Sequence, residues 1–106
     1  MTFDEYSKQA EVTAQYIGTP IDRINYVTIA LAGEVGEYMN DYKKHLRVAM
    51  NDYDTPAGPL RTAMLDELGD VLWYLSRVAY ELGSSLELVA QANITKLNAR
   101  YSRKGE

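Results

Sequence analysis

The chain has 106 residues, a formal net charge of −4 and no cysteine. This length supports one domain, and the lack of cysteine excludes disulfides and thiolate metal sites. The acidic balance argues against a protein that binds nucleic acid polymers, and no apolar run approaches the roughly 18 residues of a membrane span. Because the first residues are polar and acidic, unlike a signal peptide, we expect a cytoplasmic protein.

Capping residues mark the starts of the first two predicted helices. Thr2 and Glu5 form a capping-box pattern before a first helix that reaches about residue 16. The Thr19-Pro20 pair suits the start of a second helix, because proline is favoured in the first turn. No strong helix breaker follows before about Arg47, so the sequence predicts a long second helix.

A loop is predicted over residues 49–59, where proline, glycine and aspartate are concentrated. Pro59 suits the first position of a third helix that runs to Leu82, and Gly83 is placed to end it. These signals predict two long helices joined by one loop.

A second capping-box pattern, Ser84 with Glu87, precedes a fourth helix that reaches about Tyr101. The alternation of apolar and polar residues typical of strands is not sustained anywhere. The sequence therefore predicts an all-α fold, a four-helix bundle-like protomer in which residues 1–106 form a single domain.

Two pairs of carboxylates lie beside the apolar stripes of the second and third helices. Glu34 and Glu37 are three residues apart, and so are Glu67 and Asp70. At about 100° per residue, all four fall at the edge of an apolar face, with Glu67 nearest the core. Burying unpaired carboxylates is unfavourable and neighbouring acids repel one another, so a neutralising partner is expected.

Two kinds of partner would neutralise these acids. One is a set of basic side chains nearby in the sequence, namely Lys43, Lys44, Arg61 and Arg77. The other is a divalent cation held by oxygen atoms from two packed helices. Neither pair has a histidine at the spacing of di-iron bundles, so an all-oxygen site fits Mg²⁺, with Mn²⁺ as a substitute.

Three glycines, Gly33, Gly36 and Gly69, lie inside or beside the acid pairs. Without side chains there, helices or a ligand can approach closely. The alternative is that these are helical glycines tolerated at a cost of about 1 kcal/mol each.

The acid pairs read Glu34-Val-Gly-Glu37 and Glu67-Leu-Gly-Asp70, within the segments ALAGEVGEYMNDYKKHL and LDELGDVLWYLSRVAYELG. With FDEYSKQAEVTA and ANITKLNARY, these segments resemble the MazG-like nucleoside triphosphate pyrophosphohydrolases of the all-α NTP pyrophosphatase superfamily. The family hallmark is E-x-x-E followed by E-x-x-D, and the resemblance covers essentially the whole chain. The segment of 29 residues between the two motifs is slightly long for the family. Residues 102–106 also differ from the Pro-x-Gly-Phe sequence with which the family often ends.

The resemblance implies Mg²⁺-dependent hydrolysis of (deoxy)nucleoside triphosphates between the α and β phosphates, giving the monophosphate and pyrophosphate in nucleotide-pool house-cleaning. Glu34, Glu37, Glu67 and Asp70 would hold the metal. Glu34 and Glu37 are the catalytic candidates, with Glu34 preferred for orienting or deprotonating the attacking water. The alternative is a non-enzymatic helical interaction module with a cation-binding or degenerate carboxylate site.

The fourth helix carries a polar stripe of Asn93, Lys96, Arg100 and Arg103, of which the first three are the candidate substrate contacts. The resemblance implies that these residues contact the substrate, and the alternative is a solvated basic face. Tyr74, one turn past the second acid pair, is a further candidate for substrate binding or a half-buried core tyrosine. Trp73 is placed to stack on a base, to face solvent or to face a partner subunit.

Apolar side chains spread around the second and third helices more widely than one neighbouring helix can cover. They include Ile29, Tyr38, Met39, Tyr42, Leu72, Trp73, Tyr74 and Tyr80. We therefore expect a homodimer or homotetramer, and the resemblance implies an active site near the subunit interface. The expected partners are a nucleoside triphosphate and further copies of the chain, with no nucleic acid polymer and no membrane.

Overall fold

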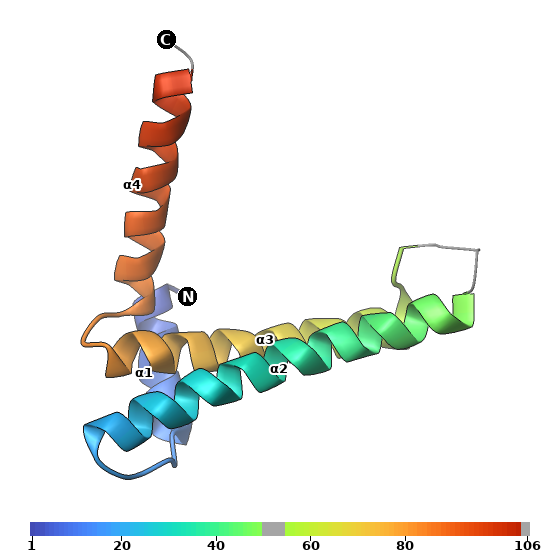
Figure 1. The fold of residues 1–106 in the computed structure, drawn as a ribbon, viewed down its shortest axis with the longest axis horizontal. Coiled ribbons are helices and arrows are strands. Elements are labelled where there is room, and N and C mark those ends of the chain that lie inside the picture. Colours follow the sequence, from blue (N-terminus) through green and yellow to red (C-terminus); the bar gives the residue numbers. More distant parts are fainter. Residues whose placement is uncertain (50–54, 105–106) are drawn as a thin grey trace.

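A computed structural model describes residues 1–49 and 55–104 of the chain. In these ranges it contains no strand and four helices: α1 (Phe3–Thr13), α2 (Pro20–Ala49), α3 (Gly58–Glu81) and α4 (Leu86–Lys104) (Figure 1). The prediction of an all-α protein with four helices is confirmed.

The capping box of Thr2 and Glu5 begins the first helix as predicted, and the second helix begins with a reciprocal pair of its own. The Thr2 hydroxyl accepts from the Glu5 N–H at 3.1 Å, and the Glu5 carboxylate accepts from the Thr2 N–H at 3.3 Å. At the start of α2, Thr19 and Asp22 exchange the same two bonds, at 3.3 and 3.1 Å. Each pair satisfies two backbone N–H donors that the first helical turn leaves unpaired.

The first helix is shorter than predicted, because it ends at Thr13 rather than near residue 16. Ala14 is extended, with φ −75° and ψ 115°, and its N–H bonds to the Glu11 carbonyl. The residues from 14 to 19 then form a connection to α2. Tertiary contacts of this connection, described below, replace the continued helix that the sequence suggests.

The turn between α3 and α4 is built on Gly83, which ends α3 as predicted and has φ +77°. The Ser84 N–H returns to the Ala79 carbonyl at 2.9 Å and closes the helix end. The predicted cap of α4 is wrong by one residue, because the Leu88 N–H donates to the hydroxyl of Ser85 at 3.2 Å. The first turn of α4 is therefore set by the residue next to the predicted cap.

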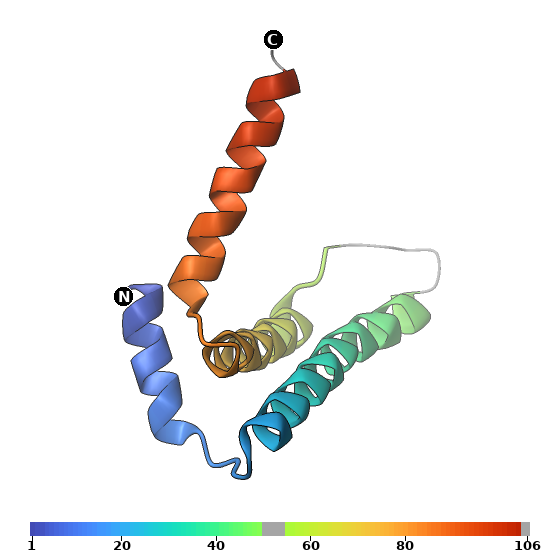
Figure 2. The ribbon, with the colours of Figure 1, turned by 60° about the vertical axis from the view of Figure 1, so that its left-hand side comes forward.

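Helices α2 and α3 lie side by side and antiparallel, and they form a long hairpin (Figure 1). Helix α1 packs against α3 and the start of α4 at one end of this hairpin. Figure 2 shows α4 projecting away from the hairpin. Within the described residues, α4 contacts α1 and α3 but not α2.

The core of the single chain is small. The buried apolar residues, among those described, are Ala10, Val27, Ala79 and Leu86, one from each helix. Large apolar side chains of α2, α3 and α4 stay exposed, including Ile29, Met39, Leu65, Tyr80 and Ile94. No helix in the described ranges has an apolar stretch long enough to cross a bilayer.

Candidate functional site

Three carboxylates of the α2–α3 hairpin converge. Glu34 of α2 meets Glu67 and Asp70 of α3, and one oxygen from each lies within 4.8 Å of the others. The spacing of three residues puts Glu67 and Asp70 on adjacent turns of one helix face, and helix packing brings Glu34 opposite them. Two oxygens bound to one Mg²⁺ or Ca²⁺ are at most about 4 to 5 Å apart, so the separation fits a shared hard cation.

In two of these acids, burial leaves one carboxylate oxygen without a hydrogen-bond partner among the described residues. Oε2 of Glu34 and Oε2 of Glu67 are buried and have no hydrogen-bond partner among the described residues. Burial, followed by the charges of Asp70 and Glu37, raises the pKa of Glu34. Burial, followed by the charges of Glu37 and Glu34, likewise raises the pKa of Glu67. The oxygen donor set and its unpaired, buried oxygens fit a hard divalent cation.

Basic side chains do not neutralise the acids within the described part of the chain, where no lysine or arginine forms an ion pair with any of the four. Arg77, one of the candidates, instead donates from Nε to the Tyr16 hydroxyl at 2.9 Å. Ion pairing by nearby lysines and arginines is therefore wrong as an account of these carboxylates in the single chain.

Glu37, the fourth predicted ligand, is exposed and is not part of the group of three. Its charge nevertheless contributes to the raised pKa of both Glu34 and Glu67, so it lies beside the cluster. Asp41 adds to the same effect on Glu67. The role of Glu37 as a ligand stays a prediction.

The three glycines near the acids do not serve close helix packing within one chain. A Cβ added to Gly33, Gly36 or Gly69 would meet no heavy atom within 4 Å beyond its own helix, among the described residues. That part of the prediction is wrong for the single chain, whereas room for a ligand stays a prediction.

Glu34 and Asp70 line a pocket of about 330 Å³ together with Thr13, Trp73 and Tyr74, which we call the carboxylate pocket. The indole N–H of Trp73 donates to the Thr13 hydroxyl at 2.9 Å, and the Trp73 ring meets the Tyr74 ring edge-on at 4.9 Å. These contacts tie the end of α1 to α3 beside the acids. Burial, followed by hydrogen bonding to Tyr26, raises the pKa of Tyr74, so its hydroxyl remains a donor at neutral pH.

A second pocket, of about 460 Å³, adjoins the first. It shares three lining residues with the carboxylate pocket and adds residues of the α1–α2 connection and of α2. We call it the aromatic pocket, and its lining residues are Thr13, Gln15, Tyr16, Ile17, Tyr26, Trp73 and Tyr74. The rings of Tyr16 and Tyr26 stack at 5.7 Å with an interplanar angle of 21°.

The predicted substrate contacts of α4 are not brought to the carboxylates in the single chain. Asn93, Lys96 and Arg100 are exposed on α4, which extends away from the hairpin that carries the acids (Figure 2). Tyr74, in contrast, lies in the wall of the carboxylate pocket.

The sequence interpretation missed the contribution of α1 and of the connection after it. Tyr6 lies close enough to Asp70 that, after burial, the charge of Asp70 raises the pKa of Tyr6. Thr13 and Tyr16 line pockets, although no motif marks them. The nine tyrosines of the chain indicate that aromatic rings are abundant, but composition does not indicate which of these rings contact one another.

Comparisons with known proteins agree with the two acid motifs. Residues 25–103 match the MazG nucleotide pyrophosphohydrolase domain, a range that includes both motifs. The chain is also 39% identical over 108 residues to the "Gene 37 protein" of Mycobacterium phage L5, covering 97% of this chain and 91% of that protein. No solved structure matches the chain. The chain therefore belongs to the MazG nucleotide pyrophosphohydrolase family.

Proposed function

We propose that the protein hydrolyses ribonucleoside or deoxyribonucleoside triphosphates between the α and β phosphates, with Mg²⁺ as cofactor. The products are the nucleoside monophosphate and pyrophosphate, and the role is house-cleaning of the nucleotide pool. The observation that carries the proposal is the cluster of Glu34, Glu67 and Asp70, with two buried, unpaired oxygens, in a chain of the MazG family.

Glu34, Glu67 and Asp70 would hold the Mg²⁺, with Glu37 beside them as a fourth ligand, and Mn²⁺ would be a substitute. When bound, the cation would neutralise charge on the phosphates and make a bound water more acidic. Placed on two packed helices, the ligands would be held in position by the hairpin rather than by a loop.

The protein side chains would orient the water and the phosphates. Glu34 is the preferred base, because its buried oxygen has no partner and can accept a proton from water. Glu37, exposed beside the cluster, is the second catalytic candidate. The Tyr74 hydroxyl, in the wall of the carboxylate pocket, would donate to a phosphate or sugar oxygen.

The surface of the single chain supports a homo-oligomer. It exposes 7987 Å², whereas a compact monomer of this length exposes about 6,000 Å². Its radius of gyration is 17.3 Å, against about 13 Å for a compact domain. An excess of about 2,000 Å² with many exposed apolar side chains is what a subunit of an obligate dimer or tetramer presents.

We place α4 of one protomer against the hairpin of another. This arrangement would cover the exposed apolar residues of α4 and bring Asn93, Lys96 and Arg100 toward the partner's carboxylates. In such an assembly these three residues would contact the phosphates, whereas in the single chain α4 does not contact α2. Since Thr13 of α1 also lines the carboxylate pocket, residues 1–106 would act as one domain.

The direct test is release of pyrophosphate from a panel of ribonucleoside and deoxyribonucleoside triphosphates, with Mg²⁺, with Mn²⁺ and with EDTA. The expected result is pyrophosphate and monophosphate in equal amounts, and only with a divalent cation. If no triphosphate yields pyrophosphate at micromolar protein, the enzymatic proposal fails and the helical interaction module takes its place.

A further inference from the structure

We propose that a pocket between α1 and the end of α3 binds a small oxyanion of the phosphate type, with Arg77 as its main ligand. The pocket has a volume of about 250 Å³ and is formed by one face of α1, the last turns of α3 and the turn before α4. We call it the Arg77 pocket, and its lining includes Ser7, Lys8, Arg77, Tyr80 and Ser84. Among the described residues it shares no lining with the carboxylate pocket or the aromatic pocket, so it is a separate site.

Arg77 is a buried cation without a carboxylate partner. It is only 6% exposed, and no aspartate or glutamate of the described residues forms an ion pair with it. Arginine is almost never fully buried unless it is paired, because a charge taken out of water needs a partner. The contacts of its guanidinium are neutral, namely the Tyr16 hydroxyl at 2.9 Å from Nε and the ring of Tyr80 at 4.4 Å from Cζ. These contacts leave the charge without a counter-ion.

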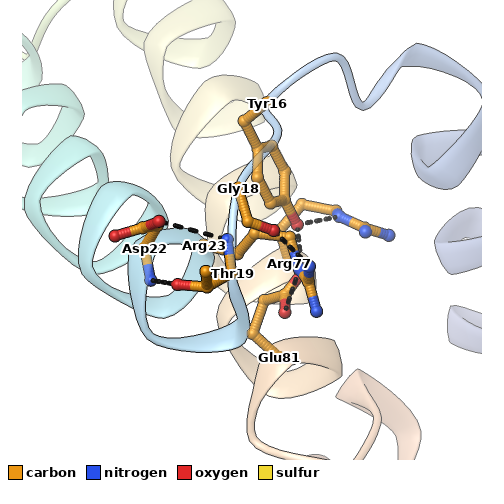
Figure 3. Close-up of polar contacts among 7 residues, drawn as sticks. All are labelled: Tyr16, Gly18, Thr19, Asp22, Arg23, Arg77 and Glu81. Atoms are coloured by element: carbon orange, nitrogen blue, oxygen red, sulfur yellow. Dashed lines mark hydrogen bonds and ion pairs between the residues drawn. The ribbon is translucent and has the colours of Figure 1, made fainter.

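The acid that shares Tyr16 with Arg77 is engaged by another arginine. Glu81 accepts from the Tyr16 hydroxyl at 3.0 Å and pairs with Arg23 Nε at 3.2 Å (Figure 3). Arg23 also donates to the Gly18 carbonyl at 2.7 Å, which ties the α1–α2 connection to this network. The network therefore holds two arginines against one glutamate, and Arg77 is the cation that stays unmatched.

The end of the Arg77 side chain keeps donors for a ligand. Its hydrogen bond within the described residues uses Nε, so the two terminal nitrogens, which carry four N–H groups, have no acceptor there. A guanidinium presents its N–H groups in a fixed fork that binds phosphate or carboxylate oxygens through two parallel bonds. An oxyanion in the Arg77 pocket would therefore satisfy both the charge and the free donors.

Helix α1 adds a hydroxyl and a second cation to this pocket. The Oγ atom of Ser7 is buried and has no hydrogen-bond partner among the described residues, which is rare for a buried hydroxyl and points to a further group that binds it. Lys8 is exposed and forms no ion pair within the described ranges, and Ser84 brings an exposed hydroxyl from the turn before α4. A tetrahedral phosphate can accept from several directions at once, so it suits this set of donors better than a planar carboxylate.

Two acids also line the pocket and limit its affinity. Asp4 lies four residues before Lys8 and Glu11 three residues after it, on the same face of α1. Both acids are exposed, so water and salt screen their charges, whereas the charge of buried Arg77 is screened much less. The volume of about 250 Å³ is below the roughly 300 to 1,000 Å³ of most small-molecule sites, so the pocket suits a small anion rather than a nucleotide.

Nitrogen-15 NMR follows the guanidinium directly. The full chain, in EDTA so that no metal reaches the carboxylates, is titrated with inorganic phosphate and, separately, with sodium chloride of equal ionic strength. The Nε–H signal of Arg77, identified by its loss in Arg77→Lys, should shift with phosphate along a saturating curve. We expect a dissociation constant of about 1 mM, and chloride should not produce such a curve.

Two variants of α1 test where the phosphate binds. Ser7→Ala and Lys8→Gln should each weaken phosphate binding about threefold or more, because each removes one donor from the Arg77 pocket. Ser102→Ala and Lys44→Gln, at exposed positions of α4 and α2 outside this pocket, are the matched controls. Both controls should bind phosphate as the wild type does.

A saturating shift of the Arg77 signal that either α1 variant weakens more than Lys96→Ala does supports the phosphate site. The site is rejected if phosphate moves this signal no more than chloride does, or if both α1 variants behave like their controls. It is also rejected if Lys96→Ala has the larger effect, which would place the anion on α4. Sequential assignment identifies the signal if Arg77→Lys does not fold. These titrations contain neither metal nor triphosphate, so their outcome is independent of the proposed hydrolysis.

Discussion

Glu34 on α2 and Glu67 on α3 bring carboxylate oxygens within 4.8 Å of each other, and each also keeps a buried oxygen with no hydrogen-bond partner among the described residues. Two charged acids in this arrangement repel each other, and their buried oxygens lose hydration. The metal-free protein is therefore less stable because of this pair, and a cation that binds both would reverse the effect.

Replacing Glu34 by glutamine should raise the thermal midpoint of the metal-free protein by a few degrees, because it removes one charge from the cluster. The same variant should lose most of the stabilisation that Mg²⁺ gives the wild type. Differential scanning fluorimetry with EDTA and with Mg²⁺ measures both effects. Glu11→Gln, at an exposed position of α1, is the matched control and should change neither value. A lower midpoint for Glu34→Gln in EDTA would contradict this account.

Stability of the metal-free protein should depend on pH in a direction set by the same pair. Burial and neighbouring charges raise the pKa of Glu34 and Glu67 above the usual 4.5, so the folded state binds protons that the unfolded state does not. Their contribution to stability should therefore increase as the pH falls through the raised pKa values, and level off below the usual 4.5.

The measurement is the thermal midpoint of the wild type minus that of the Glu34→Gln, Glu67→Gln double variant, at several pH values in EDTA. This difference isolates the pair from other titrating groups. It should become more favourable to the wild type as the pH falls from neutral toward the usual carboxyl pKa of 4.5. A difference that stays constant, or that favours the wild type more at high pH, would refute the assigned cause.

Loss of a proposed metal ligand should strongly impair the proposed hydrolysis. Glu37→Gln and Asp70→Asn should each lower kcat/KM for pyrophosphate release by about 100-fold or more, since even residues behind the ligands of a metal site commonly matter by 10- to 100-fold. Steady-state assays with saturating Mg²⁺ measure this, again with Glu11→Gln as the control. If Glu37→Gln had nearly wild-type activity, Glu37 would not be a functional residue of the site.

Glu81 should contribute to stability through its two hydrogen-bonded partners. Its side chain is 5% exposed and accepts from Tyr16 and Arg23, so Glu81→Ala leaves the Tyr16 hydroxyl and Arg23 Nε without this acceptor. We expect the free energy of unfolding to fall by about 1–3 kcal/mol, reduced from a fully buried pair because Arg23 is 35% exposed. Urea denaturation at fixed protein concentration measures this, and Glu11→Ala should stay within about 0.5 kcal/mol of the wild type.

If α4 acts on the carboxylates of a partner, two inactive variants should restore each other. Asp70→Asn lacks an acid of the hairpin and Lys96→Ala lacks a contact of α4, and a mixed dimer would contain one intact site. Mixing equal amounts with free subunit exchange should recover roughly a quarter of wild-type activity. Light scattering should give a dimer or tetramer. Recovery of no activity from exchanged subunits would place α4 on its own chain's site or outside it.

Much of the fold was predictable because its signals are local. The pair Thr2 and Glu5 marks the start of α1, and Gly83 marks the end of α3 through its left-handed conformation. The cap of α4 was misplaced because Ser84 and Ser85 are both serines and only the packed turn selects one. Helix α1 ends early because Tyr16 bonds to α3, a contact far away in sequence.

The sequence by itself determined which acids share a helix face, since the angle between residues three apart is a property of the helix alone. It also carried the two acid motifs, which lie within the range that matches the MazG domain. Only the tertiary structure decided that Glu34 meets Glu67 and Asp70, that Arg77 serves Tyr16 rather than the acids, and that Thr13, Tyr26 and Trp73 surround neighbouring pockets. Contacts between helices depend on how each is rotated and where its neighbour crosses, and these follow from packing of the whole chain rather than from any local pattern.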